Sequence, residues 1–490
     1  MQVERVLQRL EQAVWSWPLL LLILGTGFWL HLRLRGFPIR QIPRAVRCTL
    51  TGAAGENGVS PFASLCTSLS ATLGTGNMVG VAGALALGGP GALFWMNLGA
   101  IMGMSVKYAE GVLAVKYRVR EGRGYVGGPF QYLSRGLGKG GHVLAVAFAF
   151  FGAFAGLFGV GTFVQVNSIT QGAELLAATI GSVPEVTVLG RRVTGISLGL
   201  GILLGFLTAL VIFGGIRRIS RVSSFLVPAM AGVYLICCGA VLVMFRDRLP
   251  GVVSQVFQDA FTGRAATGGL LGAIQAGISR GVFSNEAGLG TAPIAAAAAD
   301  TDSPVEQGLV CMLGNVLDTN LVCTVTGLVI LCTGVWTRGM PGVGTAAAAF
   351  SLGLPFSKSV SVGLLVLCLS LFAFTTVLGW NYNAVSCLTY LTRGSSRAKW
   401  IYQILYVGSV LIAPLGTASG VWTAANLCNG LMAIPNLIGL LLLTSQVCQE
   451  TQWFLDKGDK IKIKRGSYEA DLFRRPAGRL RQTTPGPVHR

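Results

Sequence analysis

The sequence predicts an all-α protein that crosses a membrane many times. Apolar residues make up 52% of the 490 residues and charged residues only 12%, whereas a soluble domain carries about 25% charge. Glycine contributes 68 residues, and small residues allow helices to approach closely in lipid. Long apolar runs recur along the whole chain. This composition excludes a disordered chain, a secreted disulfide-bonded scaffold and a nucleic-acid-binding domain.

About eleven apolar runs are long enough to span a bilayer, which requires about 20 residues. The first run covers 14–32. We expect it to be a membrane span and not a cleaved signal peptide, because Glu4 and Glu11 precede it and arginines follow it directly. An amphipathic stretch at 39–50 comes next. The remaining predicted spans are 60–87, 91–116, 143–171, 195–214, 222–245, 268–299, 305–334, 357–391, 400–415 and 419–446.

The distribution of basic residues predicts the orientation of these spans. With the N-terminus outside, 27 Lys and Arg residues fall in inner segments and nine in outer segments, as the positive-inside rule requires. The C-terminus is then cytoplasmic, and residues 447–490 form a basic tail. The eleven cysteines lie mostly inside apolar runs, so we expect them to be small buried residues and not metal ligands.

Glycine and polar residues interrupt two of the spans. Residues 68–77 read Ser-Leu-Ser-Ala-Thr-Leu-Gly-Thr-Gly-Asn, and residues 281–290 read Gly-Val-Phe-Ser-Asn-Glu-Ala-Gly-Leu-Gly. If 1–50 is an extra helix with its amphipathic linker, a ten-helix core remains at 51–446. The interrupted helices are then the first members of two five-helix repeats, at about 51–248 and 252–446, and the second repeat is inverted. Breaks at corresponding positions are typical of a transporter's binding site.

The chemistry of a helix break limits what can bind there. A break offers free N–H groups to an anion and free carbonyl groups to a cation. Two opposed breaks therefore fit a zwitterion together with a small, hard cation. Neither a phosphate-binding loop nor a Ser/His/Asp constellation is present, and the only histidines are His31, His142 and His489. We expect a carrier without a cofactor, and not an enzyme.

Five motifs recur among the apolar runs, at 71–82, 88–92, 107–111, 281–293 and 429–437. They resemble motifs of the alanine/glycine:cation symporter family, and the resemblance covers about residues 15–446. It implies a LeuT-type fold in the bacterial inner membrane, and import of small neutral amino acids such as alanine and glycine with sodium by alternating access. A proton-coupled or glutamine- or serine-preferring carrier remains an alternative, as does a transporter-like sensor that binds an amino acid without accumulating it.

The resemblance also implies the residues of the site. Those expected to contact the substrate are Thr75, Gly76, Asn77, Gln165, Phe283, Ser284, Asn285, Gly288 and Trp380. The alternatives are a glycine hinge at the breaks and an ordinary interhelical hydrogen bond at Gln165. The oxygen ligands expected for sodium are Ser70, Leu73, Thr375 and Thr376. The alternative for the two threonines is bonding back to their own helix.

Two acids lie within predicted spans, where charge is costly. We expect Glu286 to neutralise Arg280, six residues earlier, and the alternative is that it serves the transported cation. We expect Asp318 to make a bond across to one of the breaks. The family's Ala-His-Ala is Ala-Ala-Ala at 296–298, and its Leu-Ala-Asp is Ala-Ala-Asn at 424–426. The loss of a His and an Asp weakens a proton-coupled interpretation.

Overall fold

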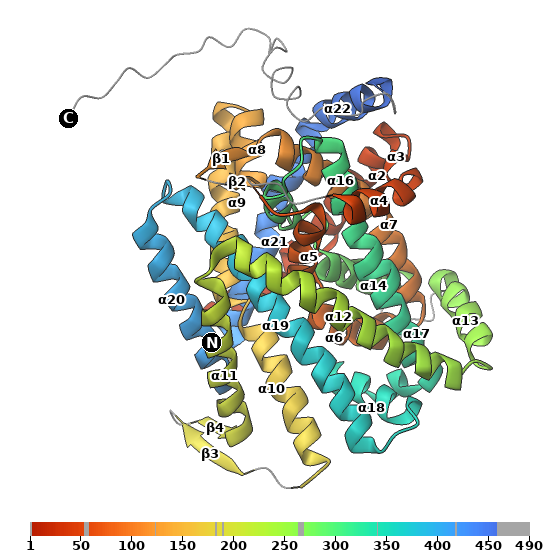
Figure 1. Cartoon of the computed structure of the whole chain (residues 1–490). Helices are drawn as coiled ribbons and strands as arrows, with labels where there is room; N and C mark the ends of the chain where they lie inside the picture. The colour runs from red at the N-terminus through yellow and green to blue at the C-terminus, as the bar shows by residue number, and fades with distance from the viewer. Residues whose placement is uncertain are drawn as a thin grey trace.

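A computed structural model of the chain describes residues 2–52, 58–122, 124–181, 184–188, 191–262, 269–340, 342–416 and 419–457. Helices dominate this part of the chain (Figure 1), as the all-α prediction requires. The strands form two short antiparallel hairpins, in which Arg120 pairs with Tyr125 and Val186 pairs with Val193. All eleven cysteines are free thiols and eight of them are buried, which agrees with their predicted role as small core residues.

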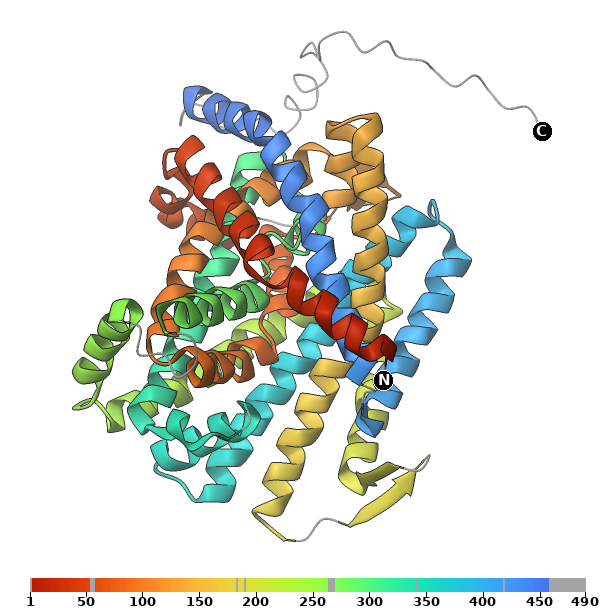
Figure 2. The same cartoon turned by 180° about the vertical axis from the view of Figure 1, so that it is seen from behind.

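The N-terminal segment forms a long oblique helix and a short amphipathic one. Figure 2 shows α1 and α2 following one another across the molecule, and α4 covers most of the stretch predicted to be amphipathic. The bounds are α1 (Gln2–Val14), α2 (Trp17–Arg33), α3 (Phe37–Arg40) and α4 (Ile42–Thr51).

The next elements contain the first interrupted helix, α5 and α6, and a long helix that bends between α9 and α10. The bounds are α5 (Pro61–Thr72), η1 (Thr75–Asn77), α6 (Val79–Gly88), α7 (Gly91–Lys116), β1 (Val119–Glu121), β2 (Gly124–Val126), α8 (Pro129–Gly136), α9 (Lys139–Phe158), α10 (Phe163–Ala178), β3 (Glu185–Val188), β4 (Arg191–Thr194), α11 (Gly195–Ile212) and α12 (Gly215–Met244).

The remaining elements contain the second interrupted helix, α14 and α15, and a span whose middle is the π-helix η2. The bounds are α13 (Leu249–Thr262), α14 (Gly269–Asn285), α15 (Ala292–Ala297), α16 (Pro304–Asn315), η2 (Val316–Cys323), α17 (Thr324–Thr333), η3 (Val335–Arg338), α18 (Gly342–Gly353), α19 (Lys358–Leu391), α20 (Ser396–Ile412), η4 (Ala413–Leu415), α21 (Ser419–Leu442) and α22 (Thr444–Lys457).

Within the described residues, nine helices are long and apolar enough to cross a membrane, and the bent pair Pro61–Thr72 and Thr75–Gly88 makes a tenth. The span predicted at 268–299 does not reach this length, because its halves α14 and α15 have 17 and 6 residues. The structure therefore supports a polytopic membrane protein, while the full eleven-helix layout stays a prediction.

The two interrupted helices lie side by side in the centre of the molecule (Figure 1). A parallel β-bridge joins Val59, just before α5, to Ala299, just after α15. The start of one interrupted helix therefore meets the end of the other, so the two helices run in opposite directions. This arrangement is what an inverted repeat requires.

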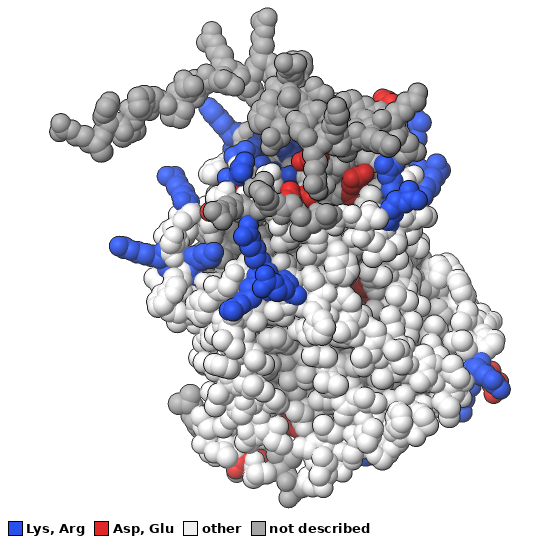
Figure 3. All heavy atoms as spheres, viewed as in Figure 1, with Lys and Arg blue, Asp and Glu red and all other residues white. Residues whose placement is uncertain are grey.

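Charged side chains mark one end of the molecule. Figure 3 shows Lys and Arg gathered towards the end that carries α22, above a broad uncharged band. Large apolar side chains face outwards from the helices, and Phe225 and Ile236 are each 74% exposed, as lipid contact permits. We call the charged end the basic end; it includes Arg40, Arg44, Arg47, Lys116 and Arg118. Most of the predicted tail, residues 458–490, lies outside the described residues.

Candidate functional site

The first break begins where α5 ends, and the two half-helices meet at an angle of 66°. Two side chains accept hydrogen bonds from the freed backbone. Asn77 Oδ1 accepts from the N–H of Gly74 at 2.9 Å, and Gln165 Oε1 accepts from the N–H of Thr75 at 3.4 Å. Gln165 thus connects α10 to the first break. This is the interhelical hydrogen bond that was the alternative to a substrate contact. Its contact with a substrate stays a prediction.

The second break begins after Asn285, whose Oδ1 accepts from the N–H of Ala287 at 2.9 Å. The chain then passes through left-handed conformations at Glu286 (φ 54°) and Gly288 (φ 86°). A β-carbon at Gly288 would also lie only 2.9 Å from Leu437 Cδ2, so this glycine is needed for the turn and for packing. Gly288 faces α21 in this structure, and its predicted contact with substrate has no support in the geometry.

The two breaks meet at Asp318, which lies in η2 and is fully buried. Its Oδ1 accepts from Asn77 Nδ2 at 2.5 Å and from Ser284 Oγ at 2.7 Å. Asn77 Nδ2 also donates to Ser284 Oγ at 3.0 Å. The expected cross-helix bond of Asp318 is confirmed, and it reaches both breaks. The sequence indicated Asp318 because it is a lone acid in an apolar span. Its pairing with two predicted site residues could be seen only in the folded structure.

One side of this cluster is only weakly bonded. Asp318 Oδ2 and the hydroxyl of Thr72 are both buried, and Thr72 acts on the Asp318 carboxylate as a donor, although neither atom has a partner at full hydrogen-bonding geometry among the described residues. Buried polar atoms are normally paired, and carboxylate and hydroxyl oxygens are ligands that a hard cation accepts. The cluster of Thr72, Asn77, Ser284 and Asp318 therefore forms a buried polar contact between the two breaks.

The predicted pairing of Glu286 with Arg280 is wrong. Glu286 Oε2 accepts from Thr291 Oγ1 at 2.5 Å, and Oε1 accepts from Trp380 Nε1 at 3.0 Å. Glu286 stands beyond the end of α14 in a left-handed conformation, so its side chain does not follow the helix face that carries Arg280. Trp380 is fully buried and bonds to this carboxylate, and it is not among the described residues that line the cavity at the first break.

Replacing Trp380 with phenylalanine is expected to destabilise the protein, because it removes the N–H that bonds to Glu286 and keeps the aromatic ring. Side-chain hydrogen bonds in membrane proteins contribute about 0.6–1.7 kcal/mol. The thermal unfolding midpoint of the purified protein should fall by about 2–4 °C. Trp400→Phe serves as the control, because Trp400 is 60% exposed; equal midpoints for the two variants would contradict this role.

Three of the four predicted sodium ligands lie together. Thr376 Oγ1 donates to the carbonyl of Leu73 at 3.3 Å. A β-carbon at Gly379, one turn further along α19, would lie 2.6 Å from Ser70 Oγ. Both threonines also bond back to their own helix, because Phe372 O accepts from Thr376 Oγ1 at 3.0 Å and from Thr375 Oγ1 at 2.9 Å. Thr375 differs in its second partner, which is Met230 Sδ at 3.5 Å. Successive helical residues point about 100° apart, so Thr375 faces α12, and its role as a ligand is a prediction without geometric support.

A cavity of about 450 Å³ reaches the first break. Thr75, Gly76 and Phe283 of the predicted substrate site line it. A β-carbon at Gly76 would lie 3.5 Å from Ser284 Cα, so the two breaks are in close contact beside the cavity. The other predicted substrate residues, Asn77, Gln165, Ser284, Asn285, Gly288 and Trp380, are not among the described residues that line this cavity.

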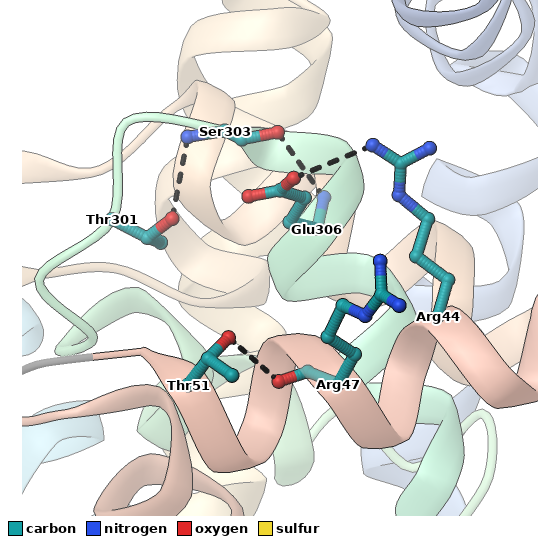
Figure 4. A network of polar contacts seen from close by, with 6 residues as sticks. All are labelled: Arg44, Arg47, Thr51, Thr301, Ser303 and Glu306. Atoms are coloured by element: carbon teal, nitrogen blue, oxygen red, sulfur yellow. Dashed lines mark hydrogen bonds and ion pairs between the residues drawn. The ribbon is translucent and has the colours of Figure 1, made fainter. Parts of the chain in front are cut away.

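Contacts at the basic end join the start of α5 to the chain that follows α15. Asp300 N–H donates to the carbonyl of Val59 at 2.8 Å, and Arg118 donates to the carbonyls of Ala299 and Thr301 at 2.5 and 2.7 Å. On the outer side of these contacts, Arg44 of α4 pairs with Glu306 at 3.7 Å (Figure 4). The cavity that reaches the first break is lined by residues of α1, η1, α6, α10, α14, α18 and α21, together with Trp15, and the residues that make these contacts do not line it.

Comparisons with known proteins identify a transporter family. Residues 1–466 match the sodium:alanine symporter family. The sodium/alanine symporter AgcS of Methanococcus maripaludis is 43% identical over 90% of this chain and 95% of its own. An uncharacterized transporter of Haemophilus influenzae is 41% identical over 96% and 99% of the two chains. The probable sodium/glutamine symporter GlnT of Bacillus subtilis is 34% identical over 91% and 89%.

A solved structure supports the fold class. The crystal structure of MhsT in complex with L-phenylalanine matches with a TM-score of 0.53 at 12% identity, covering 82% of this chain and 99% of that one. At this identity the likeness concerns the fold alone. By its match along nearly the whole sequence, the chain belongs to the sodium:alanine symporter family and is a multi-pass membrane protein with a LeuT-like fold.

Proposed function

We propose that the chain imports small neutral amino acids, with alanine and glycine first among them, together with sodium by alternating access. The observation that carries this proposal is the meeting of two helix breaks at one buried carboxylate, beside a cavity that reaches the first break. Family membership and a sodium/alanine symporter among the relatives support the same function. A probable sodium/glutamine symporter among the relatives makes glutamine the competing substrate.

The first break is suited to the carboxylate of an amino acid. Gly76 is partly exposed beside the cavity, and its lack of a side chain leaves the backbone open. Free N–H groups at a half-helix N-terminus attract anions. Phe283 Cδ1 lies 3.7 Å from the place a β-carbon would take on Gly76, so the ring narrows this part of the cavity and favours small side chains.

The surroundings of the breaks are suited to a transported cation. Glu110, Glu286 and Asp318 are buried carboxyl groups, and the buried Lys107 interacts electrostatically with all three. This leaves an excess of acidic groups over basic ones around Lys107, and buried charges require partners. A sodium ion held by oxygens of Ser70, Leu73 and Thr376 would supply positive charge nearby. Protonation of the same carboxyl groups is the chemical alternative.

The basic end supports an orientation with that end in the cytoplasm, the N-terminus outside and the protein in the bacterial inner membrane. The cavity that reaches the first break would then open towards the outside, with the cytoplasmic path closed by Val59, Arg118 and Asp300. This is the state in which a carrier receives its substrate.

Uptake of radiolabelled alanine into proteoliposomes tests the proposal. An inward sodium gradient is expected to drive accumulation, because a charge moving down 100 mV releases about 2.3 kcal/mol and a tenfold sodium gradient about 1.4 kcal/mol more. Together they support a concentration ratio of roughly several hundred. Accumulation driven by protons alone would replace sodium with protons in the mechanism. Binding without accumulation under either gradient would favour the sensor.

A further inference from the structure

The N-terminal helix α1 forms part of the cavity wall, although it lies outside the predicted ten-helix core. Glu11 and Trp15 line the cavity. Trp15 Nε1 donates to the carbonyl of Asn426 at 3.0 Å, and Asn426 Nδ2 donates to Glu11 Oε1. A β-carbon at Gly430 would lie 2.9 Å from Trp15 Nε1, so α1 and α21 are in close contact. Glu11 is therefore held at a defined place beside the cavity.

Arg280 faces the same cavity from α14. It is exposed there, six residues before the position where Glu286 bonds to Trp380. Glu11 is the acidic group whose charge acts on Arg280. Within the described residues, however, no ion pair joins the two side chains. The cavity thus has a cation on one wall and an anion on another, and neither neutralises the other directly.

We propose that Glu11 and Arg280 form a docking site for a zwitterionic amino acid on its way to the breaks. The guanidinium of Arg280 receives the carboxylate, because its donors match a carboxylate in geometry. The carboxylate of Glu11, whose Oε1 is positioned by Asn426, receives the ammonium group. The inference rests on the proposed function, since it assumes that the cavity is the entry path of an amino acid.

A docking site on the entry path has a kinetic signature. Charges that line a cleft raise the local concentration of complementary charged groups, and with it the rate of entry, by about tenfold or more. Here each charged group of the zwitterion would have one complementary side chain. A site that the substrate only passes through lowers the barrier in both directions, so its loss slows association and dissociation together. The equilibrium affinity of the central site for alanine then stays the same. A purely structural role of Glu11 in anchoring α1 would instead reduce thermal stability or equilibrium affinity.

The test compares Arg280→Gln and Glu11→Gln in the full-length purified protein. Association of alanine, followed by stopped-flow tryptophan fluorescence with sodium present, should slow by about tenfold in each variant. The dissociation constant from equilibrium binding should stay within about twofold, which corresponds to less than 0.5 kcal/mol. In proteoliposomes the KM for alanine should rise more than the maximal rate falls.

Two control variants match these substitutions. Glu4→Gln lies on the same helix α1 and outside the cavity, and Arg246→Gln removes an arginine whose side chain is 79% exposed. Both should bind alanine at the wild-type rate. Wild-type association rates in Arg280→Gln, or an equal loss in the controls, would overturn the docking site. Wild-type protein that binds alanine but never accumulates it would overturn the proposed function instead. The association rates of the variants would still show whether the docking site exists.

Discussion

Replacing Asp318 with alanine is expected to reduce sodium-driven alanine uptake by about 100-fold or more. The carboxylate accepts from Asn77 of the first break at 2.5 Å and from Ser284 of the second at 2.7 Å. Removing it leaves two buried donors without their acceptor, at about 1–3 kcal/mol each. Every 1.4 kcal/mol corresponds to about a tenfold change in an equilibrium. Initial uptake rates in proteoliposomes with equal amounts of protein provide the measurement.

A second substitution separates the connecting role of Asp318 from its charge. Asp318→Asn keeps a carbonyl oxygen that can accept from Asn77 and Ser284, so the breaks should stay connected while the negative charge is lost. Reduced sodium dependence in this variant would assign the charge to coupling, and full activity would assign Asp318 to the scaffold. Asp247→Asn is the matched control, because that side chain is 95% exposed. Folded Asp318→Ala protein with wild-type uptake would refute the central role of this carboxylate.

Replacing Gly379 with alanine is expected to lower the affinity for sodium by about tenfold or more. A β-carbon at this position would lie 2.6 Å from Ser70 Oγ and from the backbone nitrogen of Ala71, which is closer than packed atoms tolerate. Overpacking of this kind costs about 1–3 kcal/mol, and backbone cannot move aside as a flexible side chain can. The substitution should force α5 and α19 apart where Leu73 and Thr376 meet.

The sodium concentration that gives half-maximal alanine uptake is the quantity to measure. Gly363→Ala is the control on the same helix, because its β-carbon would find its nearest neighbour, Leu176 Cδ1, at an ordinary 3.7 Å. Alanine also favours a helix over glycine by about 1 kcal/mol, so this control should be at least as stable as the wild type. An unchanged sodium requirement in Gly379→Ala would show that the cation does not bind at α19. Asp318 Oδ2 would then be the next candidate ligand to test.

The local signals in the sequence predicted most of the helical framework. Apolar length indicated the spans, and α7 begins and ends at the predicted residues 91 and 116. Glycine-rich polar segments located both breaks, because a helix cannot continue through them without partners for the freed backbone. Helices α13, α18 and α22 were not predicted, since their 14, 12 and 14 residues are too few to span a bilayer, even though α18 is apolar.

The sequence by itself determined that this chain is a polytopic membrane protein with two interrupted helices, because hydropathy and glycine content act over a few neighbouring residues. Only the tertiary structure decided the partners of the functional side chains. Glu286 and Trp380 are 94 residues apart, and Glu11 and Asn426 are 415 residues apart. Contacts between residues so far apart in the sequence depend on how whole helices pack. The nearness of Arg280 in the sequence therefore did not identify the partner of Glu286. For the same reason, only the packing of α1 against α21 showed that α1 lines the cavity.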